Sequence, residues 1–426
     1  ATRASQSASQ FVTVTFGVPS KLAITTASSG IVNRSAFTTQ PVIEVQDESG
    51  NRVADATTSI VVTASAGNGA VLSGTLTMNA VNGIADFAVN PSGLKLSGAV
   101  GTYRLTFAKT GGGLTVATQD VALTPAAANS ISITTSAAGA VSGVDLTTQP
   151  IVKVIDIDGN TITSGTGSDA TIAAALTGGS ASISGTTSVQ SVNGVATFTN
   201  LRVTGTAASY TLNFAVTTPA SLNTFTTSQS ISLTHGAATQ LSISTQAAGA
   251  TSGAAFTTQP VVRVLDAQGN LVANSGVTIT ASSTSATATL SGTVSRPAVS
   301  GVATFSNLAF TGTVGTHDLN FAATGLTATT QNVVLANGAI DRIALTVSPT
   351  AAMDVPFAQQ PEVTFYDSAN NVVTAGTGSN ATVTLSATGL SGPSATNGSV
   401  DLAATNGVAT FSGLKLVTTV GTKTLT

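Results

Sequence analysis

The sequence predicts an all-β fold, organised as a tandem array of β-sandwich domains that form an elongated rod. Three observations support this prediction: an internal repeat of about a hundred residues, strands in which apolar and polar residues alternate, and turn motifs at fixed places in each repeat. A repeat of this length is long for a solenoid unit but suits a self-contained sandwich of two sheets.

Each copy of the repeat carries a Gln-Pro pair, then a short strand, then an Asp-x-x-Gly/Asn-Asn turn. Successive copies lie 109, 110 and 101 residues apart, counted from Gln40, Gln149, Gln259 and Gln360. We therefore expect four domains, of which the fourth lacks its last strand, at residues 21–126, 127–236, 237–338 and 339–426. Residues 1–20 are expected to be an unpaired last strand of a preceding or neighbouring domain.

The composition limits the classes of function. Only 7% of the 426 residues are charged and the net charge is -3, so no basic surface is expected for nucleic acid. The hydrophobic residues, 42% of the chain, are interleaved with Thr, Ser and Gly, and no apolar run of about 18 residues could cross a bilayer. The chain has no cysteine, which excludes a disulfide framework and thiolate chemistry.

The segment after each Gln-Pro alternates as a half-buried strand does. Its second and fourth residues stay apolar, while the third varies in charge and is expected to face solvent: Glu44, Lys153, Arg263 and Thr364. The turn that follows has Gly in three copies and Asn370 in the last, the two residue types that best tolerate a left-handed backbone. We expect a tight hairpin turn, opened by an Asp that bonds its own backbone.

A second turn contains Asn-Gly or Ser-Gly, a strong hairpin signal. Four residues after its Gly, each copy has a Phe that we expect to fill the core: Phe87, Phe198, Phe305 and Phe411. The next strand places three large side chains on one face in the first three copies, beginning with Tyr103, Tyr210 and His317. We therefore expect His317 to fill a site shaped for Tyr.

The motifs Thr-Thr-Gln-Pro, Asp-x-x-Gly-Asn and Asn-Gly-Val-Ala-Thr-Phe resemble the bacterial immunoglobulin-like (Big or invasin-type) repeats of tandem-repeat cell-surface proteins. The resemblance covers nearly the whole chain. It implies immunoglobulin-like repeats and an extracellular location at the surface of a prokaryotic cell, where such modules serve as spacers, adhesive tips and polymer subunits alike. The implied partners are copies of the chain itself, or other cell-surface components or glycans.

The two ends of the sequence are related. Residues 7–10 align with residues 328–331, so the chain begins with the pattern of a last strand, and Leu425 corresponds to Leu319. The leading hypothesis is that residues 1–20 complete the open fourth domain of the next subunit by donor-strand complementation, with Val12, Val14 and Leu425 at the subunit contact. Such head-to-tail contacts build filaments or surface layers. The alternative is a stalk segment of a large adhesin whose binding tip lies outside this chain.

Few residues could support chemistry. The two histidines, His235 and His317, are about 80 residues apart and lie in no catalytic motif, so no enzyme activity and no cofactor are expected. A weak calcium candidate is the turn with Asp156, Asp158 and Asn160, since oxygen ligands at alternate positions suit that ion. The equivalent of Asp158 is not acidic in the other copies. The sequence predicts a non-enzymatic structural protein.

Overall fold

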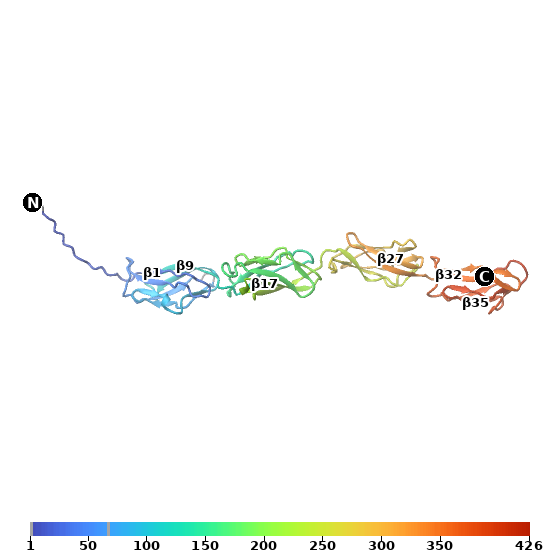
Figure 1. Cartoon of the computed structure of the whole chain (residues 1–426), viewed down its shortest axis with the longest axis horizontal. Coiled ribbons are helices and arrows are strands. Elements are labelled where there is room, and N and C mark those ends of the chain that lie inside the picture. Colours follow the sequence, from blue (N-terminus) through green and yellow to red (C-terminus); the bar gives the residue numbers. More distant parts are fainter. Residues whose placement is uncertain (1–2, 66–68) are drawn as a thin grey trace. The chain divides into compact units, whose positions relative to one another are not determined.

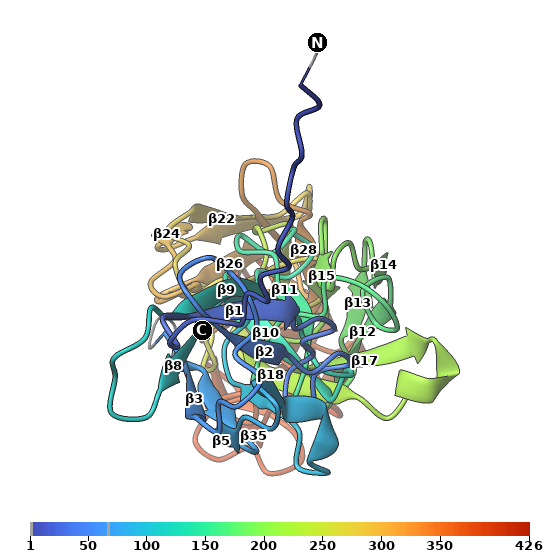
Figure 2. The ribbon, with the colours of Figure 1, turned by 90° about the vertical axis from the view of Figure 1, so that its left-hand side faces the viewer.

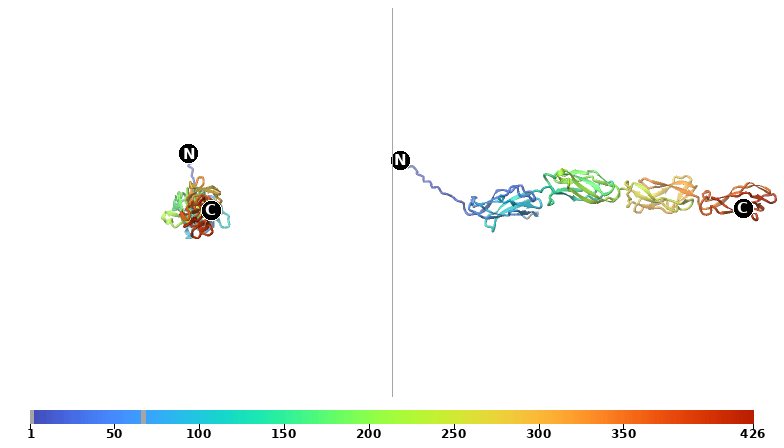
Figure 3. Two further views of the ribbon diagram at one scale, coloured as in Figure 1. Left: turned by 90° about the vertical axis from the view of Figure 1, so that its right-hand side faces the viewer. Right: turned by 60° about the horizontal axis from the view of Figure 1, so that its bottom comes forward.

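The computed structural model describes residues 3–65 and 69–426. They divide into two compact units, Ala1–Leu233 and Thr234–Thr426. Each unit contains two separate clusters of buried apolar side chains, one for each copy of the sequence repeat. In Figures 1 and 3 each copy is a separate group of strands. We call these copies repeats 1 to 4, in chain order. The all-β prediction is confirmed, because the regular elements of the described residues are strands and short 3-10 turns.

Repeat 1 packs a three-stranded sheet, in the order β1-β2-β6, against a four-stranded sheet, in the order β5-β3-β8-β9. The labels of β5, β3 and β8 follow one another in Figure 2. A short pair, β4-β7, closes one side. The elements are β1 (Lys21–Thr26), β2 (Val42–Gln46), β3 (Ser59–Ala64), β4 (Val71–Ser73), β5 (Thr77–Asn79), β6 (Ile84–Asp86), η2 (Phe87–Val89), β7 (Lys95–Ser97), β8 (Gly101–Lys109) and β9 (Ala117–Leu123).

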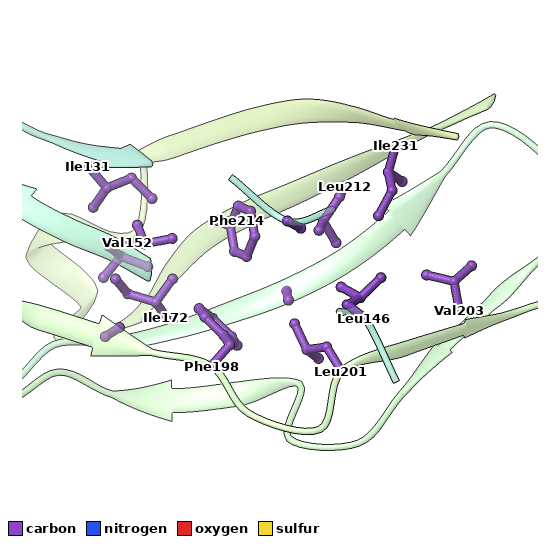
Figure 4. Close-up of a cluster of buried hydrophobic side chains, with 14 of the residues drawn as sticks. Ile131, Leu146, Val152, Ile172, Phe198, Leu201, Val203, Leu212, Phe214 and Ile231 are labelled. Atoms are coloured by element: carbon purple, nitrogen blue, oxygen red, sulfur yellow. The ribbon is translucent and has the colours of Figure 1, made fainter. Parts of the chain in front are cut away.

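Repeat 2 has the same arrangement, with sheets β10-β11-β15 and β14-β12-β17-β18 and the short pair β13-β16. Its core lies between the two sheets and is shown in Figure 4. The elements are β10 (Ser130–Thr135), β11 (Ile151–Ile155), β12 (Thr171–Thr177), β13 (Ser182–Ser184), β14 (Ser188–Gln190), β15 (Val195–Thr197), β16 (Arg202–Thr204), β17 (Ser209–Thr218), η3 (Ala220–Leu222) and β18 (Thr226–Ser232).

Repeat 3 has sheets β19-β21-β25 and β20-β28-β27-β22-β24, and the short pair β23-β26. Its elements are β19 (Gln240–Thr245), β20 (Ala250–Thr251), β21 (Val261–Leu265), β22 (Thr278–Ser282), β23 (Ala288–Ser291), β24 (Ser295–Pro297), β25 (Val302–Thr304), β26 (Ala309–Gly312), β27 (Gly315–Ala322) and β28 (Thr329–Ala336). In repeats 1 to 3 the two facing sheets and their mainly antiparallel order are those of an immunoglobulin-like sandwich.

Repeat 4 has the first sheet, β29-β32-β36, and the pairs β30-β31, β33-β35 and β34-β37. Its elements are β29 (Arg342–Val347), β30 (Thr350–Ala352), β31 (Val355–Gln359), β32 (Glu362–Tyr366), β33 (Thr382–Ser386), β34 (Leu390–Ser391), β35 (Ser399–Ala403), β36 (Val408–Thr410) and β37 (Lys415–Leu416). The last residue of β33, Ser386, pairs with Thr426 through two backbone hydrogen bonds of 2.8 and 2.9 Å.

The two turn motifs have the backbone conformations that the sequence predicts. At the second turn both central residues have positive φ, for example +51° at Asn82 and +73° at Gly83, as a two-residue hairpin of type I′ requires. At the Asp turn, φ is +88° at Gly50 and +63° at Asn370, which takes the place of Gly in repeat 4. The hairpin expected here is short, because pairing after the turn is a single bridge such as Gln46 with Arg52.

The expected core residues are buried. Phe87 and Phe198 are fully buried, and Phe305 and Phe411 are 1% and 3% exposed. In repeat 2, Phe198 packs against Phe214 with ring centroids 5.2 Å apart (Figure 4). One solvent-facing expectation was wrong: Thr364 is buried, and its hydroxyl hydrogen-bonds that of Thr346, 3.0 Å away on the neighbouring strand.

The Gln of each Gln-Pro pair ties two segments together. In repeat 1, the Gln40 side chain accepts the N–H of Leu94 at 2.8 Å and donates to the carbonyls of Phe37 and Leu94. Gln149, Gln259 and Gln360 make the same three bonds in their repeats. A half-buried amide that satisfies backbone groups in this way accounts for the recurrence of Gln.

Candidate functional site at the repeat junctions

The Asp that opens each Asp turn holds the backbone that leads into its own repeat. Its Oδ2 accepts one linker N–H in every repeat, from Gly17 to Asp47 at 2.8 Å, Ala126 to Asp156 at 3.0 Å, Gly236 to Asp266 at 2.7 Å and Gly338 to Asp367 at 2.8 Å. Its Oδ1 accepts the N–H of the Asn four residues later at 2.8 to 2.9 Å. These carboxylates are at most 5% exposed, so each one fixes linker and turn together.

The Asn that closes the same turn reaches the preceding repeat. Asn160 of repeat 2 accepts the Val100 N–H at 2.9 Å and donates to the Gly98 carbonyl at 2.9 Å. In the second unit, Asn371 of repeat 4 accepts the Val314 N–H at 2.9 Å and donates to the Gly312 carbonyl at 2.8 Å. We call the Asp and Asn of one turn, with these backbone partners, the junction clasp.

The junction between repeats 1 and 2 adds charge to its clasp. Asn33 of repeat 1 donates to Asp156 and Asp158, both at 2.8 Å. Arg34 forms a two-point ion pair with Asp158, with nitrogen–oxygen distances of 2.7 and 2.5 Å. The Asn33 amide, in a glycosylation sequon, is therefore buried against carboxylates.

These contacts hold the carboxylates in the charged form. The Arg34 guanidinium, followed by Asn33, lowers the pKa of Asp158 to about 2. The Gly17 N–H, followed by Asn51, lowers the pKa of Asp47 to about 2. At Asp156, burial opposes ionisation, but the hydrogen bonds from Asn160, Asn33 and the linker outweigh it and keep the pKa below its ordinary value.

The junction between repeats 3 and 4 uses neutral groups around its clasp. The amide of Asn337 donates to the Ala375 carbonyl at 2.9 Å and accepts the Ala375 N–H at 3.2 Å. Gly338 lies so close to repeat 3 that a Cβ placed on it would be 2.4 Å from the carbonyl oxygen of Ser252. Close packing here takes the place of the ion pair at the other junction.

The calcium candidates Asp156, Asp158 and Asn160 lie together, but their polar atoms have protein partners. The Asp156 carboxylate accepts hydrogen bonds from Asn33, Ala126, Asp158 and Asn160. A cation would have to displace these donors, and the described residues include no group of three or more His, Cys, Asp or Glu placed to hold a metal. Calcium binding stays a prediction.

The expected subunit-contact residues belong to different units, Val12 and Val14 to the first and Leu425 to the second. Residues 3–18 form no strand, and Val12 and Val14 are 75% and 85% exposed. Leu425 packs at the edge of the repeat 4 core and lines a groove of about 450 Å³ with Leu345, Phe357 and Leu416.

The groove in repeat 4 lies where the other repeats have their last strand. Ile343 on β29 is 61% exposed, whereas its equivalents Leu22, Ile131 and Leu241 are 5 or 6% exposed. In repeats 1 to 3 the last strand also carries a Gln that bonds the backbone between the first two strand segments, as Gln119 does with Ser28 at 2.8 and 2.7 Å. Repeat 4 has Pro349 at the position of Ser28, so it could offer such a Gln a carbonyl but no N–H.

The prediction for His317 is confirmed. The Tyr103 hydroxyl donates to the carbonyl of Ala99 at 2.6 Å, and that of Tyr210 to Thr206 at 2.7 Å, an arrangement known as a tyrosine corner. In repeat 3 the Nε2 of His317 donates to the Thr313 carbonyl at 2.8 Å, and its Nδ1 lies 2.8 Å from the Ser285 hydroxyl. His317 is thus a buried structural group.

Sequence reasoning missed the partners of the turn Asn and of the turn Asp. One signal was available. The same turn position holds Asn in all four copies, although the turn itself requires only the left-handed residue before it: Asn51, Asn160, Asn270 and Asn371. Because the partners are backbone groups of other segments, no motif in the sequence marks them.

Comparisons with known proteins add a distant likeness. No protein-family model matches the chain, and no curated protein matches it. Among solved structures, the chain is similar to the Escherichia coli adhesin FdeC, with 16% identity over 76% of this chain and 100% of that one, at a TM-score of 0.40.

Two further solved structures are similar over most of the chain. Invasin, a bacterial integrin-binding protein, shows 14% identity over 90% of this chain and 73% of that one, with a TM-score of 0.33. Domains 4–9 of the surface layer protein SbsC show 16% identity over 96% and 63%, with a TM-score of 0.21. All three TM-scores are below 0.5, so the immunoglobulin-like architecture rests on the strand pairing of the chain itself. Among the described residues, no helix is long and apolar enough to span a membrane.

Proposed function

We propose that this chain is a non-enzymatic structural protein of a prokaryotic cell surface, built of immunoglobulin-like sandwiches at residues 21–126, 127–236, 237–338 and 339–426, with a junction clasp joining the two sandwiches of each unit. The observation that carries the proposal is the clasp at the two junctions inside the units. There, buried carboxylates and amides join neighbouring sandwiches rather than facing a ligand. Because these polar groups already bond the neighbouring sandwich, they favour a spacer or building block over a receptor or an enzyme.

The finer proposal is assembly by donor-strand complementation, in which residues 1–20 of one copy fill the repeat 4 groove of the next. Apolar pairs on the last strands of repeats 1 to 3 are buried, for example Val333 and Leu335 at 3% and 1% exposure. Val12 and Val14 have the same spacing, and both are exposed in the single chain. Main-chain pairing would supply affinity, and these two side chains would supply the apolar contact.

Electron microscopy of the 426-residue chain, beside a variant that lacks residues 1–20, tests this assembly. We expect filaments or sheets from the intact chain and isolated particles from the variant. A variant with both Val12→Asp and Val14→Asp keeps the length of the segment but cannot bury its side chains, so it should also stay unassembled. Phe11→Asp is the matched control, because Phe11 aligns with Asp120, Ser230 and Asn332, which are exposed on the last strands of repeats 1 to 3.

The second candidate is a stalk segment of a longer adhesin, in which residues 1–20 belong to a covalently linked preceding sandwich. The clasps support it equally, since a stalk also needs fixed junctions. Isolated particles from both the intact chain and the shortened variant would favour the stalk over the assembling subunit.

A further inference from the structure

We propose that Asn397 is a site of spontaneous chemical modification, at which the side-chain amide is lost as ammonia and a carboxylate takes its place. The backbone nitrogen of Gly398 loses its proton and bonds to the Cγ of Asn397, which closes a five-membered imide. The Cγ–Nδ2 bond breaks, and Nδ2 takes up a proton and leaves as ammonia. Water, the one co-reactant, then opens either C–N bond of the ring and gives aspartate or isoaspartate.

Two identical Ala-Thr-Asn-Gly segments in repeat 4 allow a controlled comparison. They are residues 395–398 and 404–407, and each forms a two-residue hairpin turn. The φ angles of Asn and Gly are +51° and +80° in the first turn, and +50° and +80° in the second. The Thr of each turn exchanges two backbone hydrogen bonds with the residue after the Gly, of 2.8 and 3.1 Å in the first turn and 2.8 and 3.2 Å in the second. Local sequence and turn geometry are therefore matched.

The two turns differ in what the attacking nitrogen bonds. The N–H of Gly407 donates to the Ser379 carbonyl at 2.8 Å, and Gly407 is buried. By contrast, the N–H of Gly398 donates to no acceptor among the described residues, and Gly398 is only half-buried beside the exposed Asn397. The Gly398 nitrogen can therefore give its proton to solvent and turn toward the Asn397 Cγ without losing a hydrogen bond of its own.

Three other Asn-Gly pairs in the described part of the chain have the protection of Gly407. The N–H groups of Gly83, Gly194 and Gly338 donate to an oxygen of a distant segment, at 3.2, 2.7 and 2.8 Å. Asn68, which also precedes a glycine, lies outside the described residues. A bond of this kind in a buried place must break before the nitrogen can attack, and its loss is large enough to slow the reaction about tenfold or more.

The modification changes repeat 4 in two ways. It adds one negative charge to a chain whose net charge is -3, because a neutral amide becomes a carboxylate. The isoaspartate product also adds one carbon to the backbone between Thr396 and Ser399, within the ring that their two hydrogen bonds close. Since Ser399 begins β35 and pairs with Ser386 of β33, we expect the pairing of these two strands to loosen.

The test incubates the full chain in mildly alkaline buffer made with water that carries a heavy oxygen isotope, so that each converted residue is marked. Cleavage before Asp401 places Asn397 and Asn406 on different peptides for mass spectrometry. We expect Asn397 to convert about tenfold faster than Asn406, or more. The same chain unfolded in urea is the control, because the identical segments should then convert at similar rates.

Equal conversion in the folded chain, or faster conversion of Asn406, would overturn the proposal. The same excess at Asn397 in urea would also overturn it, since the difference would then come from the neighbouring sequence and not from the fold. Asn397→Gly removes the amide and keeps a residue that suits positive φ, so the early gain of charge should disappear. Asn406→Gly is the matched variant and should keep that early gain.

Discussion

The junction of repeats 1 and 2 and the junction of repeats 3 and 4 share one clasp and differ in everything around it. Both use a buried Asp on the linker N–H and an Asn on two backbone groups of the preceding repeat. The first adds Asn33 and the Arg34–Asp158 ion pair, whereas the second adds Asn337 and the tight approach of Gly338. The comparison indicates that the clasp sets the junction and that the surrounding charges are optional.

The largest effect is expected from removing the clasp carboxylates. Asp156→Ala and Asp367→Ala each leave the linker and turn N–H groups without an acceptor in a buried place, so each should cost its repeat about 3 kcal/mol. Hydrogen exchange of amides in β11 and β32 measures this loss repeat by repeat. The costs should be similar at the two junctions, and a loss at Asp156 alone would make the surrounding charges, not the clasp, decisive.

A smaller effect is expected from the clasp amides. Asn160→Ala and Asn371→Ala each remove two hydrogen bonds to the preceding repeat, worth about 1 kcal/mol apiece. We expect the distance distribution between spin labels on the two joined repeats to broaden in both variants. Asn332→Ala, at an exposed position on β28, is the matched control and should leave it unchanged. An unaltered distribution in Asn371→Ala would show that packing at Gly338 suffices.

Acid should separate the two junctions. The pKa of Asp158 in the folded chain is about 2, below the ordinary value of 3.8, so its contribution is fully present above about pH 4 and is lost as the pH falls toward 2. The junction of repeats 3 and 4 has Ala369 at that position and keeps only the clasp carboxylate. The spin-label distances across repeats 1 and 2 should therefore broaden more between pH 4 and pH 2. Equal broadening would contradict a role for Asp158.

The smallest effects are expected from the exposed ion pair and from calcium. Arg34→Ala should weaken the first junction slightly, and less so in high salt, because the pair is solvent-screened.

A chelator should leave the melting midpoint unchanged, since N–H donors already occupy the Asp156 carboxylate. A lower midpoint with chelator, restored by calcium, would instead support an ion at Asp156, Asp158 and Asn160.

Much of the fold could be predicted because its signals are local. Alternation of apolar residues gave the strands, positive-φ residue types gave both turns, and Phe87 and its counterparts are buried as expected. Thr364 was wrongly expected to face solvent. Its hydroxyl hydrogen-bonds that of Thr346 on the neighbouring strand, a partner that the alternation of apolar residues cannot reveal. The equivalence of His317 and Tyr103 could be predicted from register alone, and both side chains donate to the carbonyl four residues earlier in the chain.

The candidate site could be predicted only in part. The sequence identified the recurring Asp and Asn residues, but it assigned them to turns or to a calcium ion. Their partners Val100, Gly98 and Gly338 lie tens of residues away in the chain. A hydrogen bond to a backbone group places no demand on the partner's side chain, so it leaves little trace in the sequence.

The sequence by itself determined the repeat, the strands, the turns and the apolar positions of this protein, because each depends on the side chains of a short segment. Only the tertiary structure decided which carboxylates are buried, which amides join two repeats, and that Ile343 is exposed while its counterparts are buried. The physical reason is that burial and hydrogen-bond partnership depend on which distant segments meet.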